Sequence, residues 1–597
     1  MKISHLTCLL LFIAYASSGQ TNAYKISFDN AVHHEAEIAG YFPNIAADTL
    51  AIRMSRTSPG RYALHEFAKN VYNFKATDGS GKKLKITRPD PYQWLVSGHN
   101  GEVHISYTLF ANRGDGTYSQ IDETHAHLNI PATFMYAPSL SEREIEITFL
   151  PREDLNWKIA TQLPLLEKTT YTAPNLQYFM DSPTEISDYS LREFTVDNQT
   201  IQFALHHNGT KEELDTYFEK VKKVVLAEKE VFGELPIFDY GTYVFLACYI
   251  PNASGDGMEH RNSTILTSTR SLAEGGMERN IGTVSHEFFH AWNVERIRPK
   301  SLEPFDFEKA NMSGALWFAE GFTSYYTNLM LCRAELISQE SYVERLSGTF
   351  NYVWNSPARK FFNPIEMSFQ APFVDAATSV DPVNRENTFI SYYSYGSILG
   401  LALDLTLREH NLNLDDYMKL VWKTYGKNQK PYTISDLHDS LNTYAGAAFG
   451  DNFFNRFIYK SEMPDYKVLL EANGILLKRN ANNPYFGVAA AINDDLNGVI
   501  NSNPRIGSPA YKAGLDKGDV ILRINEQAFP NGESFDKYIA KLNVGDVLNV
   551  EFERFGIKKN RQVTLQPDPT YVITLMEKES LEPNKETLQK RTAWLKN

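Results

Sequence analysis

The sequence is poor in cysteine, in net positive charge and in long apolar runs, and each shortage excludes a class of protein. Only 3 cysteines occur in 597 residues, so a disulfide scaffold is excluded. The net charge of -13 disfavours a nucleic-acid partner, because such proteins usually present a basic face. Tandem repeats and low-complexity segments are absent from the sequence. Abundant aromatics, 36 Phe and 33 Tyr, indicate a folded chain rather than a disordered one.

The first twenty residues have the order of a secretory signal peptide. Lys2 supplies a positive start, residues 6–15 are almost wholly apolar, and small residues follow as far as Gly19. The apolar run is too short to span a bilayer comfortably, and no other segment has transmembrane length. The alternative is a buried N-terminal strand. We therefore expect an exported protein, periplasmic or secreted, with a signal peptide over residues 1–19.

Two of the three cysteines would remain in the exported protein. Cys8 would leave with the signal peptide, and it lacks the small preceding residues of a bacterial lipoprotein. Cys248 and Cys332 would remain, and in an oxidising compartment they could form one disulfide. The sequence alone leaves open whether the two meet.

The pattern along the chain predicts several domains of α+β type. Short alternating runs such as VHISYTLF (residues 103–110) lie between Pro, Gly, Asn and Asp in the first part, which indicates an all-β domain. Helical periodicity dominates later segments, and a β-rich unit follows near residue 480. The predicted organisation is a signal peptide (1–19), a β-rich domain (20–207), a catalytic domain (208–337), a helical region (338–479), a β-rich C-terminal module (480–567) and a charged tail (568–597).

The string HEFFH (residues 286–290) contains candidate metal ligands. On a helix, His286 and His290 lie on one face and can hold one metal ion, and Glu287 projects near the open metal position. Zinc lowers the pKa of bound water to about 7, so Glu287 could act as the general base. A catalytic zinc needs a third protein ligand. Glu320, in the apolar helix LWFAEGFTSYY, fits this role, because an unpaired carboxylate there would be costly.

These strings resemble a known family. HEFFHAWN followed by LWFAEGFTSYY looks like the gluzincin peptidases, in which the third zinc ligand is the Glu of an E-G pair on a second helix. With GDGMEHRNST and PFDF, the pattern is similar to the glycyl aminopeptidase family. The resemblance implies a β-rich N-terminal domain, a thermolysin-like catalytic domain, a helical region and a PDZ domain, with one Zn²⁺ per chain. The gap between His290 and Glu320 is longer than in the commonest gluzincins.

The segment from Gly257 to His260 resembles the GxMEN element of aminopeptidases, with His260 in place of Asn. The resemblance implies that Glu259, flanked by Gly257 and Met258, pairs with the free α-amine of a peptide substrate. A fixed negative charge near the zinc favours a substrate that ends there in an ammonium group. The alternative is an exposed turn that carries a charged pair.

SYYSYGS (residues 391–397) resembles the aminopeptidase Y-x-K-G element, whose Tyr donates a hydrogen bond to the oxyanion of the transition state. Tyr393 matches that Tyr, although Tyr395 stands where Lys is usual, and Tyr392 is a rival. A phenol can donate a hydrogen bond without bringing a charge. The alternative is that these tyrosines only pack at a helix start.

The C-terminal module resembles a PDZ domain of bacterial proteases, on PYFGV and KAGLDKGDVILRIN. The resemblance implies that Phe486, Gly487 and Val488 form the loop that receives a peptide C-terminus, with β-augmentation on the next strand. The alternative is a module that only packs against the catalytic domain.

Three functions remain open. The first is a zinc aminopeptidase that removes N-terminal residues, Gly, Ala or another small residue by the family's implication. The second is an endopeptidase on the same zinc site. The third is a non-catalytic peptide-binding envelope protein, which the intact set of His286, Glu287, His290 and Glu320 argues against.

Overall fold

The computed structural model describes residues 20–374, 383–493, 497–528 and 534–596, so the predicted signal peptide lies outside the described residues. These residues form two compact units. The first contains the described residues up to 58 and residues 66–190, and the second contains residues 59–65 and those from 191 onward. Within the described ranges, no helix is both long enough and apolar enough to cross a membrane.

The first unit is built from β-sheets, as predicted for the N-terminal part of the chain, but it ends at residue 190 rather than 207. The strand over residues 199–207 pairs instead with a strand of the second unit. Burial alternates along β1, so one face of its sheet is packed and the other is wetter. The main sheet has the order β12 (Leu165–Glu167), β13 (Thr170–Ala173), β10 (Ile145–Leu150), β1 (Asn22–Ser27), β2 (Glu35–Phe42), β7 (Val103–Phe110), β4 (Val71–Thr77). Further sheets join β3 (Thr49–Arg53), β6 (Gln93–Ser97) and β5 (Lys85–Asp90), and β11 (Lys158–Thr161), β14 (Thr184–Ser187), β9 (His125–Leu128) and β8 (Gln120–Ile121).

The second unit begins with a mostly parallel sheet covered by helices. Its order is β15 (Ser190–Val196), β16 (Gln199–His207), β17 (Thr242–Tyr249), β19 (Ser263–Ser268), β18 (Asp256–His260). The strand β17 is buried at nearly every position, as expected for a parallel strand with both faces covered. The strand β18 runs antiparallel to β19 and forms an edge of the sheet.

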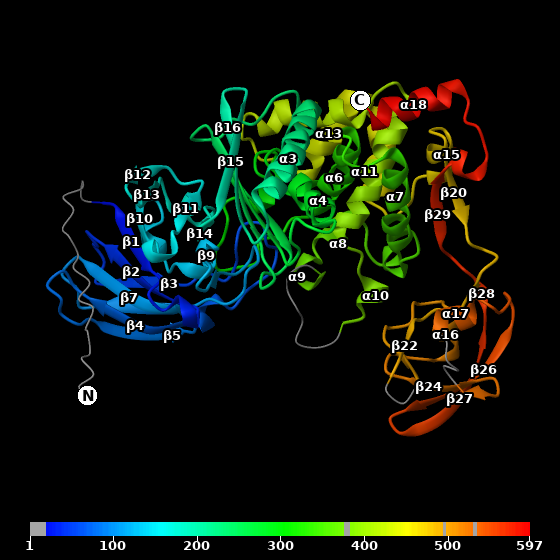
Figure 1. Ribbon diagram of the computed structural model, residues 1–597, viewed down its shortest axis with the longest axis horizontal. Helices are drawn as coiled ribbons and strands as arrows, with labels where there is room; N and C mark the ends of the chain where they lie inside the picture. The colour runs from blue at the N-terminus through cyan, green and yellow to red at the C-terminus, as the bar shows by residue number, and fades with distance from the viewer. Residues whose placement is uncertain (1–19, 375–382, 494–496, 529–533, 597) are drawn as a thin grey trace. The chain divides into compact units, whose positions relative to one another are not determined.

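Helices α3 (Lys211–Phe232), α4 (Gly276–Phe289), α6 (Gly321–Arg333) and α11 (Tyr392–Glu409) lie side by side in this unit (Figure 1). Thr210 and Glu213 form a capping box that starts α3, and Gly233, at φ +82°, ends it. Further helices complete the helical region: α5 (Leu316–Ala319), α7 (Gln339–Trp354), α8 (Pro364–Ser368), α10 (Arg385–Thr388), α12 (Leu414–Val421), α13 (Ile434–Ala445), α14 (Ala447–Phe453) and α15 (Tyr466–Glu471).

The β-rich C-terminal module is held at both ends by strand pairs. The chain enters it through β20 (Ile475–Arg479), which pairs antiparallel with the returning strand β29 (Tyr571–Leu575). Asn351 of α7 exchanges two hydrogen bonds with the backbone of Tyr571, at 2.7 and 2.8 Å. The module itself contains β22 (Ala490–Ile492), β23 (Gly498–Ile500), α16 (Pro509–Ala513), β24 (Val520–Ile524), α17 (Phe535–Ile539), β26 (Val547–Arg554) and β27 (Ile557–Thr564).

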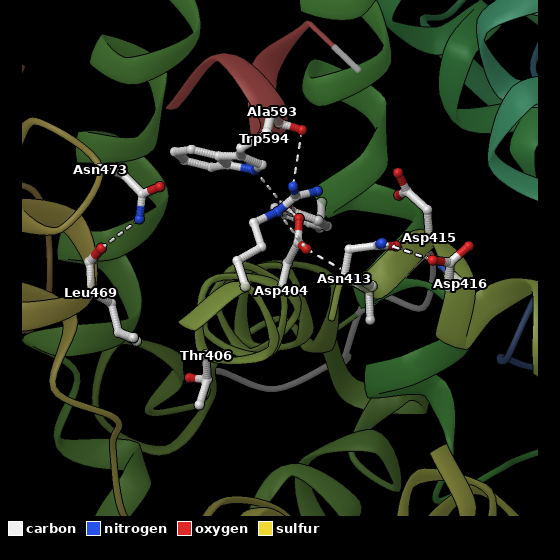
Figure 2. A network of polar contacts seen from close by, with 12 residues as sticks. Asp404, Thr406, Asn413, Asp415, Asp416, Leu469, Asn473, Ala593 and Trp594 are labelled. Carbon is white, nitrogen blue, oxygen red and sulfur yellow. Dashed lines mark hydrogen bonds and ion pairs between the residues drawn. The ribbon is translucent and has the colours of Figure 1, made fainter. Parts of the chain in front are cut away.

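The C-terminal segment returns to the helices as α18 (Lys585–Leu595). Trp594 is fully buried, and its indole N–H donates to the Tyr325 hydroxyl at 2.9 Å. Tyr325 in turn donates to Asp404 at 2.6 Å, and Arg408 donates both to Asp404 and to the Ala593 carbonyl, each at 2.9 Å. Figure 2 shows this network, in which Asp404 joins α11 to the end of α18. A segment that looked only charged in sequence therefore helps to fix the helix that follows Glu320.

Replacing Trp594 by Ala tests this docking. Large-to-small changes at buried Trp cost about 3–5 kcal/mol, so the urea midpoint of the second unit should fall clearly. Leu588→Ala, on the same helix but 38% exposed, is the matched control and should change little. Equal midpoints for the two variants would contradict a docked C-terminal helix.

Candidate metal centre and peptide-binding site

The HEFFH string lies at the end of α4, with His286 in its last turn and His290 as its C-cap in helical conformation. The Nε2 atoms of the two imidazoles face each other at 3.2 Å. Glu320 joins them from the junction between α5 and α6, and its Oε2 lies 3.5 Å from His286 Nε2 and 3.2 Å from His290 Nε2. The structure thus brings the three predicted ligands together in one place.

Hydrogen bonds at the other ring nitrogens orient both histidines. His290 Nδ1 lies 2.6 Å from the Asn293 carbonyl, which can only accept, so Nδ1 carries the proton. His286 Nδ1 lies 3.2 Å from Thr327 Oγ1, whose own proton goes to the Thr323 carbonyl. Each ring therefore turns Nε2 toward the other ring and toward Glu320.

This donor set fits a zinc ion. Two imidazole nitrogens and a carboxylate oxygen converge within 4.8 Å, which are donor atoms that a zinc ion accepts. Two His and one Glu are a usual catalytic zinc set, which leaves a further position for water or substrate. His290 and Glu320 are each only 1% exposed, so an ion here would be largely shielded from bulk water.

Two more carboxylates lie beside this centre. Oxygens of Glu259 and Glu287 and a nitrogen of His290 also lie within 4.8 Å of one another. Glu287 packs against the backbone of the edge strand β18: a Cβ added to Gly257 would lie 2.1 Å from Glu287 Oε1. Glu259 faces the same space from β18, between the buried residues Met258 and His260. Gly257 and Glu259 of the predicted amine-binding segment thus lie beside the metal centre.

Burial controls the charge of these groups before any cation binds. Burial raises the pKa of Glu287 well above its usual range, His290 opposes this, and Glu259 adds to it. Burial likewise raises the pKa of Glu259. Burial lowers the pKa of His286, which favours the neutral ring that a metal ion needs. Crowded carboxylates of this kind are stabilised by a positive partner.

The two rival tyrosines have different surroundings. The Tyr393 ring lies 5.8 Å from the His286 ring, and both residues line a cavity of about 240 Å³ with Ser324 and Arg345. Tyr392 is 1% exposed and is a buried member of an apolar cluster, whereas Tyr393 is only partly buried at its edge. Tyr395 is also buried, and burial raises its pKa to about 12. Of the three, Tyr393 is the phenol beside the metal centre and an open cavity.

The predicted carboxylate-binding loop lines a larger cavity, of about 620 Å³, in the C-terminal module. Phe486 is buried and packs edge-on against Phe535 at 5.0 Å. Gly487 has φ +102°, and a Cβ there would lie 2.6 Å from the Cβ of Ser508. Val488 and Arg505 also line the cavity. The loop therefore approaches the neighbouring helix start too closely for a side chain at position 487.

Two features of the site have no signal in the sequence. Tyr62 donates a hydrogen bond to Glu320 Oε1 at 2.5 Å from a segment 258 residues away. Glu228 of α3 is fully buried and accepts a 2.8 Å hydrogen bond from Ser285, next to His286. Neither residue stands in a motif. The predicted disulfide alternative is also settled, since Cys248 and Cys332 are both buried and are not joined.

Comparison with known families agrees with this architecture. Residues 23–188 match the Peptidase M61 N-terminal domain, residues 279–399 match M61 glycyl aminopeptidase, and residues 479–565 match a PDZ domain.

A solved structure shares the fold over nearly the whole chain. An aminopeptidase N family protein from Idiomarina loihiensis superposes with a TM-score of 0.84 at 23% identity, over 96% of this chain and 100% of that one. An M1 zinc metallopeptidase from Deinococcus radiodurans is more distant, with a TM-score of 0.45 at 11% identity over 75% of this chain and 95% of that one.

The site combines an edge strand, a helix with two histidines and a glutamate from the junction of two later helices. This combination defines the chain as a metallopeptidase. The matched segments point to one family: residues 23–188 and 279–399 are similar to M61 glycyl aminopeptidases, and residues 479–565 are similar to a PDZ domain. It is therefore a hydrolase of the zinc-dependent aminopeptidase class. The predictions of family, fold class and enzyme class from the sequence are confirmed.

The buried Glu228 gives a prediction for stability against pH. Burial raises its folded-state pKa well above 4.5, with the Ser285 hydrogen bond opposing. Below about pH 4.5 both folded and unfolded chains hold the proton, whereas above it only the unfolded chain loses the proton. Stability should therefore fall as pH rises toward the folded-state pKa. Glu228→Gln removes this loss, so its thermal midpoint should equal the wild type near pH 4.5 and exceed it by about 2 °C or more near pH 8.

Glu230→Gln is the matched control, because Glu230 lies on the same helix and is exposed. It should show no pH-dependent difference from wild type. A Glu228→Gln midpoint that differs from wild type by the same amount at every pH would contradict a protonated buried carboxyl.

Proposed function

We propose that the protein removes a small N-terminal residue, Gly or Ala, from peptides with a free α-amine, using one zinc ion per chain. The observation that carries this proposal is the position of Glu259, whose carboxylate lies within 4.8 Å of the Glu287 and His290 atoms of the metal centre. A buried anion so close to the reacting bond favours a substrate whose chain begins there with an ammonium group.

His286, His290 and Glu320 would hold the zinc. When bound, zinc supplies Lewis acidity that polarises a carbonyl and acidifies water. Glu287 takes the proton of the attacking water and passes it to the leaving amine, a role that suits a carboxylate whose pKa burial has raised. Tyr393, beside His286, donates a hydrogen bond to the oxyanion of the tetrahedral intermediate.

The space beside Glu259 supports a small first residue. A cavity of only about 10 Å³ lies there, lined by Gly60, Tyr62, Glu259, Val294 and Arg298 among others. Such a cavity holds about one water molecule. A substrate with its ammonium group at Glu259 would find almost no room there for a side chain.

Charge-removing variants separate exopeptidase from endopeptidase chemistry. Wild type should release the chromophore from Gly and Ala anilides, and N-acetylation should abolish turnover. Glu287→Gln should lower kcat about 10²–10⁴-fold, because it removes the general base. Glu259→Gln should raise KM for free-amine substrates about tenfold or more, because it removes the partner of the ammonium group.

Glu278→Gln is the matched control for both variants, because Glu278 lies exposed on the same helix as Glu287. It should leave both constants within about twofold. Cleavage of blocked peptides that survives Glu259→Gln would instead support an endopeptidase.

We further propose that the PDZ cavity receives the C-terminus of a peptide and that the protein is exported to the periplasm or beyond. The first proposal is supported by the cavity at Phe486, Gly487 and Val488, and the second by the N-terminal segment of the sequence. Neither proposal alters the chemistry assigned to the metal centre.

Two glycine variants test the PDZ proposal. Gly487→Ala should weaken binding of fluorescent peptides with a free C-terminus about tenfold or more, because its Cβ would collide with Ser508. Gly556→Ala imposes similar backbone strain at φ +75° but meets no atom within 4 Å, so it is the matched control. Fluorescence polarisation with free and amidated peptides measures both. Equal affinity for free and amidated peptides would contradict carboxylate capture.

A further inference from the structure

A short segment from the early part of the sequence belongs to the peptidase unit. Residues 59–65 cluster with the second unit, although residues 58 and 66 belong to the first. Three consecutive residues of this segment, Gly60, Arg61 and Tyr62, each contact a different part of the site described above. None of the three stands in a motif of the sequence.

Tyr62 holds the oxygen of Glu320 that faces away from the histidines. Its hydroxyl donates to Glu320 Oε1 at 2.5 Å, whereas Oε2 is the oxygen that faces both imidazoles. The two carboxylate oxygens therefore have separate partners. Tyr62 is 3% exposed, so no bulk water can replace its hydroxyl at Oε1.

The Tyr62 ring packs against residues of the long segment between His290 and Glu320. The ring lies in an apolar cluster with Val294 and Leu302 from the insertion and with Leu316 and Ala319 just before Glu320. The long segment between the two ligands thus supplies the apolar side chains against which Tyr62 packs. Because all of these residues are buried, the phenol has one position available to it.

Arg61 and Gly60 bind the same segment to the edge strand. Arg61 forms an ion pair with Asp256. Its guanidinium also donates a hydrogen bond to the Gly257 carbonyl at 3.4 Å. Gly60 has φ +80°, and a Cβ there would lie 2.5 Å from Met258 Cγ and 3.1 Å from Glu259 Oε2. Position 60 therefore has no room for a side chain beside the carboxylate of Glu259.

We propose that residues 59–65 complete the active site, with Tyr62 as a positioning residue for the metal ligand Glu320. By holding Oε1, Tyr62 would keep Oε2 as the oxygen turned toward the two histidines and the metal ion that they would hold. By lying against Glu259, Gly60 closes the amine-binding space from the other side. The second role rests on the proposed aminopeptidase function, whereas the first requires only that the centre binds zinc.

Tyr62→Phe in the full-length protein tests the first role without any substrate. Partners that orient a metal ligand typically contribute 10–100-fold to metal affinity, so the zinc Kd measured by chelator competition should rise by that factor. Tyr417→Phe is the matched control: Tyr417 is 2% exposed and donates to the Leu437 carbonyl at 2.9 Å, away from the metal ligands. Its zinc Kd should stay within about twofold of wild type. A wild-type zinc Kd in Tyr62→Phe would overturn the proposal.

Arg61→Ala covers the case in which Tyr62→Phe does not fold. It leaves the hydroxyl in place but frees the segment from β18, so the zinc Kd should rise at least threefold, and an unchanged Kd would overturn the proposal. Gly60→Ala tests the second role: KM for Gly-anilide should rise about tenfold, and an unchanged KM would overturn that role. Because zinc is titrated in the absence of peptide, failure of the aminopeptidase assignment would be seen separately as missing turnover.

Discussion

The close crossing of two helices sets the geometry on which the site depends. A Cβ added to Gly321 would lie 2.3 Å from Gly396 Cα, and one added to Gly396 would lie 1.9 Å from the Trp317 carbonyl oxygen. Only glycine fits at both positions. Glu320 directly precedes Gly321, and Tyr393 lies about one turn before Gly396 on α11. The crossing therefore brings the third metal ligand and the phenol to the same centre as the helix of His286 and His290.

Buried negative charge is the second feature that explains the chemistry. Glu259, Glu287 and Glu320 are each 6% exposed or less, and burial raises the pKa of the first two. Leaving such charges without a partner is costly. A divalent cation at the three ligands and an ammonium group at Glu259 would offset that cost. In the proposed function, this burial would favour both a metal ion and a substrate with a free amine.

The sequence was sufficient where chemistry depends on local spacing. The i, i+4 relation of His286 and His290, and an acid in the apolar run around Glu320, predicted the residues that the fold brings together. The choice between Tyr392 and Tyr393 needed coordinates, because neighbouring residues on a helix point about 100° apart and either can face the metal.

Contacts between distant parts of the chain could not be predicted. Tyr62 reaches Glu320 across 258 residues, and nothing in Gly60-Arg61-Tyr62 distinguishes it from an ordinary loop. The C-terminal segment was predicted only as a charged tail, because the burial of Trp594 depends on Tyr325 and Asp404, which are distant in sequence. In both cases the position of the residue depends on a buried tertiary hydrogen bond, which local periodicity does not reveal.

The central claim is that one zinc ion, held by His286, His290 and Glu320, makes this chain an aminopeptidase. The most direct test is to strip the full-length protein with a chelator and add zinc back in fractions of an equivalent while following release from Gly-anilide. The account predicts that activity rises linearly and reaches its plateau at one equivalent per chain. Activity that survives complete zinc removal, or a folded protein that binds one equivalent and releases nothing from any free-amine substrate, would contradict it.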